Sequence, residues 1–537
     1  MSTPDVSVIV AVYNTMPYLT DCLDSLVHQS IGRDKVEVIA VDDGSTDEGG
    51  AELERYAARF PDTVTVIHQA NSGGPAAPSN RGLEVATGRY VFFIGADDYL
   101  GPQALERLVD AADRWGSDVI FGKMVGANGR RIPQTMFATT EQDVDLYDSE
   151  LPFALSNTKL FRRDLVEKYQ LRYPEDLPIG SDQPFTVEAL VRAKRVSVLS
   201  DYTFYYAVKR TDSSNISFSS SFSERIRCTA AIMDFIADLV EAGPRRDAIL
   251  RRHFSWGVAR LLRENFLDLN EKDQKQLCNS VRQVADDYFT EGVQRRLSVW
   301  PRLRIKLAQE GDLARLREVI RHRAVKRPHP LVSDGERIFV KYPELLEVGL
   351  NDDFYVVDHG DVATLAKGTF EAAVSRLQSG GLHLEARIAI TGTYGPPHAE
   401  LVLIPVAKLT STPGVRTYPA PGDPAGVIDV DVRVCADGDM SEFTADIEPL
   451  ALLVDESADV VHRALRLRVR LAHLVLELPL PAPSDQRSVR LRSGLRFYKL
   501  KILEGKSRLV TAQSAVPLKS VVQARVRRVP KILGRSK

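Results

Sequence analysis

The chain contains little cysteine, little tryptophan and almost no net charge. Its 537 residues include 4 cysteines and 3 tryptophans, and 70 Lys and Arg residues nearly balance 72 Asp and Glu residues, for a formal charge of -2. Cys22, Cys228, Cys278 and Cys435 lie far apart and form neither a CxxC pair nor a Cys/His cluster at zinc spacing. This spacing argues against a disulfide framework and against a zinc module. The charge balance argues against a nucleic-acid-binding protein.

Long hydrophobic runs are also missing. No uninterrupted apolar run approaches the roughly 20 residues that a membrane-spanning helix needs. Residues 1–5 lack a basic stretch followed by an apolar one, so we expect no secretory signal. We therefore expect a cytoplasmic protein, or one held peripherally on the inner face of the cell membrane. The content of 44% apolar and 26% charged residues is typical of a globular chain, and the length predicts three or four domains.

The first 120 residues alternate strand and helix patterns. Nearly continuous apolar runs, typical of buried strands, lie at residues 6–12, 36–41, 63–68 and 90–94. Helical periods lie between them at residues 18–27, 48–60 and 78–86. This alternation predicts an α/β domain with a parallel sheet covered on both faces. From residue 222 to about 324 the period is helical throughout, which predicts a connector of several helices.

The remaining third of the chain alternates apolar and polar residues. Period-2 runs at residues 382–390, 427–434 and 465–471 are separated by Pro, Gly and Asp, which predicts antiparallel sheets. Residues 487–537 carry 15 Lys and Arg residues and one acidic residue, Glu504. Two interpretations of this basic segment stay open: a solvated strand edge and chain end, or attachment to an anionic partner such as a lipid surface or a polyphosphate polymer.

Polar and aromatic residues follow each of the first four predicted strands. In order, these segments are Tyr13–Asn14, Asp42–Asp47, Asn71–Pro75 and Ala96–Asp98. Ligands of an open α/β sheet bind beyond the carboxyl ends of its strands, so we expect these residues to share one site. An aromatic ring can stack on a base, a carboxylate can accept a uracil N–H, and a carboxylate can hold a divalent cation against a diphosphate. The set therefore predicts a site for a uridine diphosphate sugar, and neither a GxGxxG nor a GxxxxGK[ST] motif competes with it.

Each member of this set has a simpler interpretation when it is taken alone. Ser45 or Asp47 can be a helix N-cap, and the Gly73–Pro75 segment can be an ordinary turn. Tyr13 can be a core aromatic residue. The whole set, in this order along the chain, indicates a UDP-sugar site more specifically than any single residue does.

Several motifs resemble known transferases. The segments Val8–Asn14, Val41–Asp47 and Ala96–Asp98 resemble the family 2 glycosyltransferases of GT-A fold. Further segments resemble the bacterial subgroup that adds β-N-acetylglucosamine to the poly(ribitol phosphate) of wall teichoic acid: residues 71–75, 128–137, 155–160, 181–185, 197–201 and 205–210. The resemblance covers roughly residues 6 to 215, and the rest of the chain agrees in layout alone.

The resemblance implies a role for individual residues. It places Tyr13, Asp43, Asn71, Gly74, Asp97, Arg130 and Arg210 at the donor, with Tyr13 stacked on uracil and the two arginines near the diphosphate or the acceptor phosphates. It implies a divalent cation, Mn²⁺ or Mg²⁺, bound by Asp97 with Asp98 beside it. It also implies that Asp182 is the catalytic general base. Local sequence alone favours Asp182 as a helix cap, and the resemblance reverses that preference.

The chain departs from the family pattern at four positions. Ala11 stands where the family usually has Pro, and Gly95 stands where the first carboxylate of the Asp-X-Asp motif is expected. Ser79 replaces an expected arginine, and Ser181 replaces an acidic residue expected before the base. These departures predict a weaker metal site and a changed donor preference.

Together these observations predict a GT-A domain at residues 1–220, a helical connector at 221–328, an all-β immunoglobulin-like sandwich region at 329–486 and a basic strand or tail at 487–537. The expected activity is inverting transfer of a sugar, N-acetylglucosamine first, from a UDP donor to a polyol-phosphate, teichoic-acid-like cell-wall polymer. Two alternatives stay open: a UDP-hexose transferase acting on a capsular or lipid-linked glycan, and a catalytically decayed polymer-binding protein. We also expect a homo-oligomer, a trimer in the related subgroup, assembled through the C-terminal region, with the basic tail contacting the membrane.

Overall fold

The computed structural model describes residues 3–210 and 220–324 as two continuous stretches. Beyond these, and apart from a few single positions, it describes the segments 330–333, 336–340, 352–357, 369–379, 382–392, 397–405, 416–419, 427–429, 431–434, 441–448, 461–471, 474–481, 489–493, 496–504 and 509–515. The chain forms two compact units, Met1–Leu297 with Arg304–Arg321, and Ser298–Leu303 with His322–Lys537. The predicted GT-A domain and most of the predicted connector therefore belong to one unit.

The first unit is built on a mixed eight-stranded sheet in the order β3-β2-β1-β4-β7-β6-β8-β5. Its strands are β1 (Val6–Val12), β2 (Val36–Asp42), β3 (Val64–His68), β4 (Tyr90–Gly95), β5 (Tyr99–Leu100), β6 (Val119–Ala127), β7 (Leu160–Arg162) and β8 (Val196–Val208). The four strands predicted from the sequence are β1 to β4, and they pair in parallel as expected. The sheet differs from the expectation in its second half, where β7 runs antiparallel to both β4 and β6.

Strand direction decides where the loops of this unit meet. Strand β7 is antiparallel to both β4 and β6, so β4 and β6 run in the same direction. Strand β8 pairs in parallel with β6 and therefore runs in this direction too. The carboxyl ends of β1, β2, β3, β4, β6 and β8 therefore face the same edge of the sheet. The short strand β7 begins at this edge, because Leu160 at its start pairs with Phe92 near the end of β4.

Helices pack on this sheet through apolar faces. They are α1 (Tyr18–Val27), α2 (Gly49–Arg59), α3 (Ala76–Val85), α4 (Ala104–Trp115), α5 (Arg163–Lys168) and α6 (Asp182–Arg192). Residues of β1 and α1 such as Val8, Val10 and Leu23 are fully buried in one apolar core. On α3, a Cβ at Gly82 would come within 2.5 Å of Ile9, so glycine is what lets this helix approach β1.

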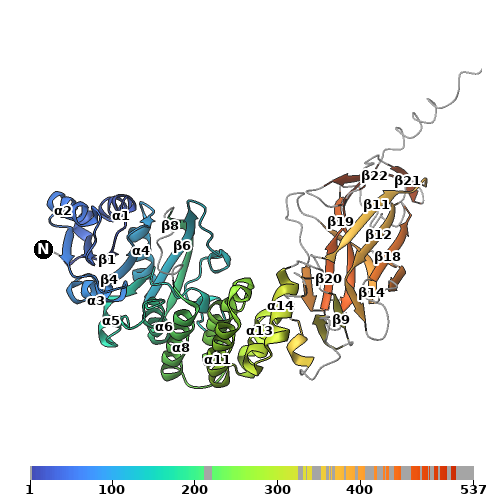
Figure 1. Cartoon of the computed structure of the whole chain (residues 1–537). Helices are drawn as coiled ribbons and strands as arrows, with labels where there is room; N and C mark the ends of the chain where they lie inside the picture. Colours follow the sequence, from blue (N-terminus) through green and yellow to red (C-terminus); the bar gives the residue numbers. More distant parts are fainter. Residues whose placement is uncertain are drawn as a thin grey trace, which may run out of the picture. The chain divides into compact units, whose positions relative to one another are not determined.

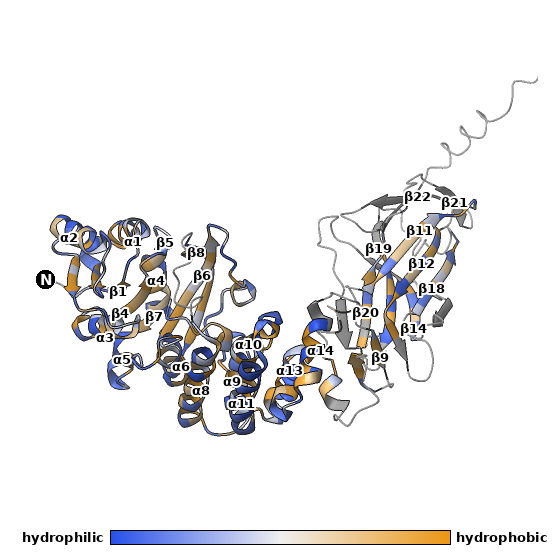
Figure 2. Cartoon of the chain, in the orientation of Figure 1, coloured by the Kyte–Doolittle hydropathy of each residue, from blue (hydrophilic) through white to orange (hydrophobic). Residues whose placement is uncertain are grey.

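The connector continues the first unit as a group of helices, as the sequence predicted (Figure 1). They are α8 (Phe222–Leu239), α9 (Pro244–Arg252), a π-helical turn at His253–Val258, α10 (Ala259–Leu261), α11 (Glu271–Tyr288), α12 (Glu291–Arg295), α13 (Val299–Glu310) and α14 (Leu313–Ala324). Figure 2 shows hydrophobic and hydrophilic residues on both α8 and α11, as expected for helices with one buried face. No helix in the described part of the chain is long and apolar enough to cross a membrane.

The second unit is built from β-sheets, which confirms the predicted all-β region; an immunoglobulin-like topology is not established. Its described strands are β9 (Leu331–Ser333), β10 (Ile338–Val340), β11 (Glu371–Arg376), β12 (Leu382–Ile388), β13 (Ile390–Gly392), β14 (His398–Pro405), β15 (Arg416–Pro419), β16 (Val427–Asp429), β17 (Asp431–Val434), β18 (Ser441–Ile447), β19 (Val461–Leu471), β20 (Leu474–Pro479), β21 (Val489–Ser493), β22 (Arg496–Glu504) and β23 (Leu509–Ala515). They form sheets of three, four and eight strands.

The basic segment after residue 486 is partly sheet. Strands β21, β22 and β23 pair with one another, and β23 pairs with β19 of the eight-stranded sheet. The sheet therefore extends past the boundary predicted at residue 486. Residues 516–537, with most of the interleaved basic and apolar pattern, lie outside the described residues, as does Cys435. Cys22, Cys228 and Cys278 are buried free thiols.

Candidate active site

The residues predicted to bind a donor converge on the edge where the parallel strands end. Tyr13 follows β1, and its side chain is 45% exposed, which makes it one of two exposed large hydrophobic residues in the described chain. Asn14 has a positive φ of 50° and turns the chain away from the strand. Its side-chain oxygen accepts the Thr46 N–H at 2.7 Å, and its carbonyl oxygen accepts Nη2 of Arg210 at 2.9 Å. The ends of β1, β2 and β8 are thus tied together beneath an exposed aromatic ring.

Asp43 joins the loops that follow β2 and β3. The carboxylate is 3% exposed and accepts Nε2 of Gln69 at 2.6 Å and the hydroxyl of Ser72 at 2.9 Å. The side-chain amide of Asn71 donates to the Asp43 carbonyl at 3.1 Å. Gly44, at φ +73°, is required here because a Cβ would lie 2.8 Å from the Asn71 nitrogen. A uracil N–H would have to share or replace one of these bonds to reach Asp43.

The acidic loop after β4 separates its two aspartates into different environments. Asp98 is buried, and its two oxygens accept the Tyr205 hydroxyl at 2.6 Å and the Val208 N–H at 2.7 Å. Burial, with the charge of Asp97 beside it, raises the pKa of Asp98 to about 6. Arg130 lies 3.7 Å from the same carboxylate and donates to the Val208 carbonyl at 3.1 Å. Asp98 therefore links the loop after β4 to the end of β8 and to Arg130.

This arrangement bears on the implied metal ion. Gly95 offers no carboxylate, and each oxygen of Asp98 accepts one hydrogen bond, so the predicted role of Asp98 as a metal ligand would use its remaining lone pairs. No cluster of three His, Cys, Asp or Glu side chains suited to a metal occurs among the described residues. A cation bound to a diphosphate keeps several waters and needs only one or two protein carboxylates. Asp97, partly exposed at the end of β4, fits such a one-carboxylate site.

Asp182 begins α6 on the side of the edge where β7 starts. The helix has no side-chain cap at Ser181, and Asp182 lies within the first turn instead of at the cap position. Burial raises the pKa of the Asp182 carboxyl, while Arg252, Lys159 and the backbone N–H groups of Asp182 and Asn157 oppose the rise. A raised pKa makes a carboxylate a stronger base, so the local structure suits proton abstraction better than capping.

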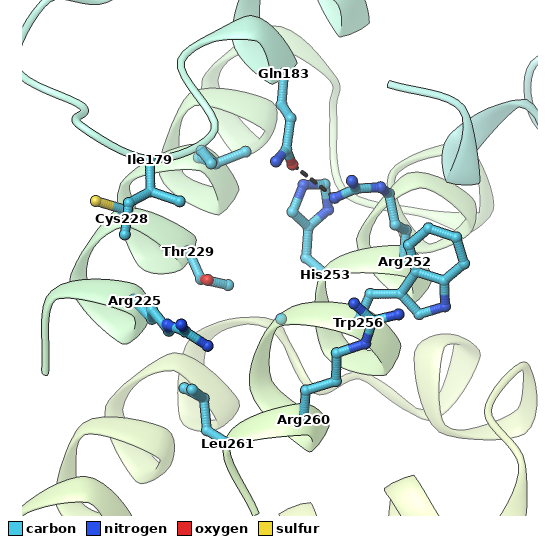
Figure 3. A pocket seen from close by; sticks show the side chains of 12 residues that line it. Ile179, Gln183, Arg225, Cys228, Thr229, Arg252, His253, Trp256, Arg260 and Leu261 are labelled. Atoms are coloured by element: carbon cyan, nitrogen blue, oxygen red, sulfur yellow. Dashed lines mark hydrogen bonds between the residues drawn. The ribbon is translucent and has the colours of Figure 1, made fainter. Parts of the chain in front are cut away.

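A cavity of about 230 Å³ lies between Gln183 of α6 and the connector helices. Its wall carries three arginines, Arg225, Arg252 and Arg260, together with His253 and Trp256. Figure 3 shows Arg225 and Arg260 reaching toward the same space, and Arg252 donating to the Gln183 side chain, at 2.6 Å. The cavity is thus cationic, and it adjoins the residue that follows Asp182.

Two polar atoms near this cavity have no hydrogen-bond partner. They are the buried Nε of Arg252 and Nε2 of His253. Burial lowers the pKa of Arg252 to about 10 and that of His253 to about 3. Desolvation is the larger cause of both shifts, neighbouring arginines add to them, and for Arg252 the charge of Asp182 opposes the fall. The cavity therefore suits an anion.

The structure brings most predicted site residues to one edge, and it adds residues that the sequence analysis missed. Arg252, His253 and Trp256 lie in helical segments whose arginine-rich sequence gave no sign of a site. Lys159 lies in one of the motifs that carried the resemblance, but no role was assigned to it. Arg81 does not stand in for the arginine missing at Ser79, because it forms an exposed ion pair with Glu84.

Comparisons with known proteins agree with this geometry. The model of glycosyl transferase family 2 matches residues 7–170, and that of the glycosyl transferase TarS linker domain matches residues 227–320. A poly(ribitol-phosphate) β-glucosyltransferase of Bacillus spizizenii is 30% identical over 66% of this chain and 56% of its own length. The poly(ribitol-phosphate) β-N-acetylglucosaminyltransferase TarS of Staphylococcus aureus is 38% identical over 51% of this chain and 48% of its own length.

A solved structure extends the comparison to a bound ligand. The crystal structure of S. aureus TarS residues 1–349 in complex with UDP-GlcNAc matches with a TM-score of 0.56 and 31% identity, covering 63% of this chain and 97% of that one. The match to each of the two enzyme sequences spans only about half of the relative's length.

Proposed function

Because the chain belongs to glycosyl transferase family 2, we propose that it transfers a hexosyl group from a UDP-sugar to a hydroxyl of an anionic polyol-phosphate polymer. The observation that carries this proposal is the position of Asp182 at the start of α6, directly before Gln183 in the wall of the cationic cavity. The relatives act on poly(ribitol phosphate), which supports a teichoic-acid-like acceptor.

The donor would lie across the carboxyl ends of β1 to β4. Tyr13 offers an exposed ring on which uracil can stack, and stacking of a base on an aromatic side chain contributes about 1–3 kcal/mol. Asp43, Asn71 and Gly74 would line the nucleoside, and Arg130 and Arg210 would face the diphosphate. Asp97 would hold the divalent cation, Mn²⁺ or Mg²⁺, which when bound stabilises negative charge on the leaving diphosphate.

Asp182 would act as the general base in an inverting displacement. Its carboxylate takes the proton from the acceptor hydroxyl, the hydroxyl oxygen bonds to the anomeric carbon, and the bond from that carbon to the diphosphate breaks. The electron pair leaves with UDP, so no protonated acid is needed on the leaving side. The raised pKa of Asp182 strengthens it as a base, and Arg252 and Lys159 oppose the rise by favouring the ionised carboxylate.

The cationic cavity would hold a phosphate of the acceptor. A polyol phosphate repeats one negative charge per unit, and a phosphate bound by Arg225, Arg252 and Arg260 would place a neighbouring hydroxyl near Asp182. This arrangement would give the buried Nε of Arg252 and Nε2 of His253 a charged partner.

The test is UDP release by the purified chain given poly(ribitol phosphate), a divalent cation and either UDP-N-acetylglucosamine or UDP-glucose. Both donors are needed because one relative is named for glucose and the other for N-acetylglucosamine. We expect polymer-dependent release that Asp182→Asn reduces about 10²–10⁴-fold, the usual range for a general base. Arg260→Gln should raise the KM for the polymer and leave the Kd for UDP unchanged.

Two outcomes would redirect the proposal. Release with other UDP-sugars and a glycan acceptor, but not with the polyol phosphate, would favour the capsular or lipid-linked alternative. Binding of the polymer without turnover, unchanged by Asp182→Asn, would favour the decayed binding protein suggested by Gly95 and Ser181. Assembly through the second unit, with three copies expected, is a separate proposal that the mass of the protein in solution tests.

A further inference from the structure

Lys159 is a buried charged residue to which the proposed reaction gives no task. Its side chain is 1% exposed and lies in the segment that leads into β7. Nζ donates to the Ser156 carbonyl at 2.7 Å and lies 4.6 Å from the centre of the Phe121 ring. An ammonium group is rarely buried without a carboxylate partner, because desolvation strongly disfavours its charge.

The segment that Lys159 holds also touches the proposed base. The Lys159 N–H donates to the Asn157 carbonyl at 2.7 Å, and the Asn157 N–H donates to the Asp182 carboxylate. The Asn157 side chain donates to the Tyr173 hydroxyl at 3.0 Å. Lys159 therefore closes a turn at Ser156 and Asn157 whose backbone N–H points at Asp182.

The charges around Asp182 can be stated in full for the described residues. Arg252 on α9 and Lys159 before β7 act on it as cations, and Tyr173 acts through its hydroxyl. Arg252 donates to Gln183, and Lys159 donates to Ser156, so neither forms a direct ion pair with Asp182. Burial lowers the pKa of Lys159 to about 7, and Asp182 opposes the fall.

We propose that Lys159 is a positioning residue for the base: its ammonium and the turn that it closes hold Asp182 as an oriented carboxylate. This inference rests on the proposed function, in which Asp182 takes the acceptor proton. Lys159 does not touch the substrate. Its effect should appear in the pH at which Asp182 becomes active and not in the binding of the donor.

The experiment compares the pH dependence of kcat for the wild type, Lys159→Met and Lys159→Gln. Loss of a nearby cation raises the pKa of a carboxylate, typically by about 1–3 units within 4–6 Å. We therefore expect the acid limb of the kcat profile to move up by about one pH unit in both variants. At pH values below the midpoint of this limb, the kcat should be about tenfold lower than that of the wild type, because a rise of one unit in the pKa lowers the ionised fraction of the base about tenfold. At high pH the kcat should equal that of the wild type. The KM for the UDP-sugar should stay within about twofold.

The matched control is Lys168→Met, which removes an exposed ammonium that also lies over a ring, 4.8 Å from the centre of Tyr169. This variant should leave the profile unchanged. Lys159→Gln keeps a donor for the Ser156 carbonyl but removes the charge. It therefore separates the effect of the lost charge from any structural change that the methionine causes. A uniform fall of kcat at every pH, with the acid limb unmoved in both Lys159 variants, would overturn the proposal.

A second measurement needs no activity. The midpoint of thermal unfolding is compared for Lys159→Met, Asp182→Asn and the double variant across pH 5 to 9. Residues that interact directly show non-additive effects, and distant ones add. We expect non-additive shifts at pH values where the Asp182 carboxyl is ionised and Lys159 is still protonated, and these shifts should shrink as the pH rises above about 7. Additive shifts at all pH values would overturn the coupling. If the wild type transfers no sugar, the proposed function fails, and this cycle still decides whether Lys159 acts on Asp182.

Discussion

Each of the two units buries a cluster of charged side chains, and the clusters are built in opposite ways. In the second unit, Arg468 of β19 donates to Glu400 at 3.1 Å and to Glu477 at 2.8 Å, and all three are nearly fully buried. Burial opposes the charge of Arg468, but Glu477 and Glu400 outweigh it and raise the arginine pKa. This cluster consists of direct ion pairs, and its charges are favoured.

The cluster around Asp182 in the first unit contains no such direct pairs. Lys159, Asp182 and Arg252 act on one another electrostatically, yet each donates to or accepts from neutral groups. Their pKa values all move toward the uncharged forms. Strongly perturbed pKa values cluster at functional sites, and direct pairing restores the charged forms in a structural cluster. The difference teaches that burial has opposite consequences for charge with and without a direct ion-pair partner.

The sharpest way to test the comparison is the same carboxylate-to-amide change in each cluster. Asp182→Asn should lower the transfer rate about 10²–10⁴-fold. It should not lower the unfolding midpoint at pH 8, because the raised pKa of Asp182 means that the folded state disfavours its charge. Glu400→Gln should instead lower the stability and leave the Kd for UDP unchanged. Assays of transfer, UDP binding and thermal unfolding on both variants check these outcomes, and a stability loss confined to Asp182→Asn would break the comparison.

Removing the central arginine of the paired cluster should have the next largest effect. Arg468→Met removes the cation that Glu400 and Glu477 share and leaves Glu400 with Arg470 alone, at 2.9 Å. Breaking a buried pair in this way costs about 3–5 kcal/mol of unfolding free energy. Denaturant unfolding of the full chain measures it. The control is Arg387→Met, which breaks an exposed pair with Glu442 and should cost less than about 1 kcal/mol. Equal losses in the two variants would show that the buried cluster carries no special stability.

The nucleotide edge should respond independently of both clusters. Tyr13→Ala should weaken UDP binding by about 1–3 kcal/mol, which corresponds to a Kd increase of about 5- to 150-fold. Tyr13→Phe keeps the ring and should bind nearly as the wild type does. Calorimetric titration with UDP measures both variants. An unchanged Kd for Tyr13→Ala would remove this residue from the donor site.

The smallest expected effect belongs to an exposed charge group of the first unit. His68 contacts Asp42 at 2.9 Å and Glu54 at 2.8 Å, and its pKa is raised, with Glu54 the larger cause and Asp42 the next. Because the pKa of His68 is higher in the folded state than in the unfolded chain, protonation of His68 stabilises the folded state. This contribution is complete at pH values below the unfolded pKa of about 6.5, and it is lost as the pH rises through the folded pKa. His68→Gln should therefore cost up to about 1 kcal/mol at pH 5.5 and less at pH 8.5, since the ring is half exposed. A loss of unfolding free energy that is the same at both pH values would contradict this assignment.

Much of the fold was predictable because its signals are local. The buried strands β1 to β4 appear as continuous apolar runs, and the alternating residues of β12 appear in the structure as buried Leu382 and Leu384 with exposed neighbours. Alternation predicted β19 as a strand but said nothing about which polar residues are buried. Arg466 and Arg468 are 3% and 4% exposed, and Glu400 and Glu477, which pair with Arg468, lie on other strands.

The sequence by itself determined that Tyr13, Asp43, Asn71 and Asp97 share one edge of the sheet, because parallel strands bring their carboxyl ends together. The strand order β3-β2-β1-β4, which sets their positions along that edge, came from the tertiary structure. Only the tertiary structure decided what each carboxylate does. Asp98 is engaged by Tyr205 and Val208, 107 and 110 residues away, and Gln183 is held by Arg252, 69 residues away. Contacts across such distances leave no periodic pattern in the chain. The differences in burial and hydrogen bonding among Asp97, Asp98 and Asp182 exist only after folding.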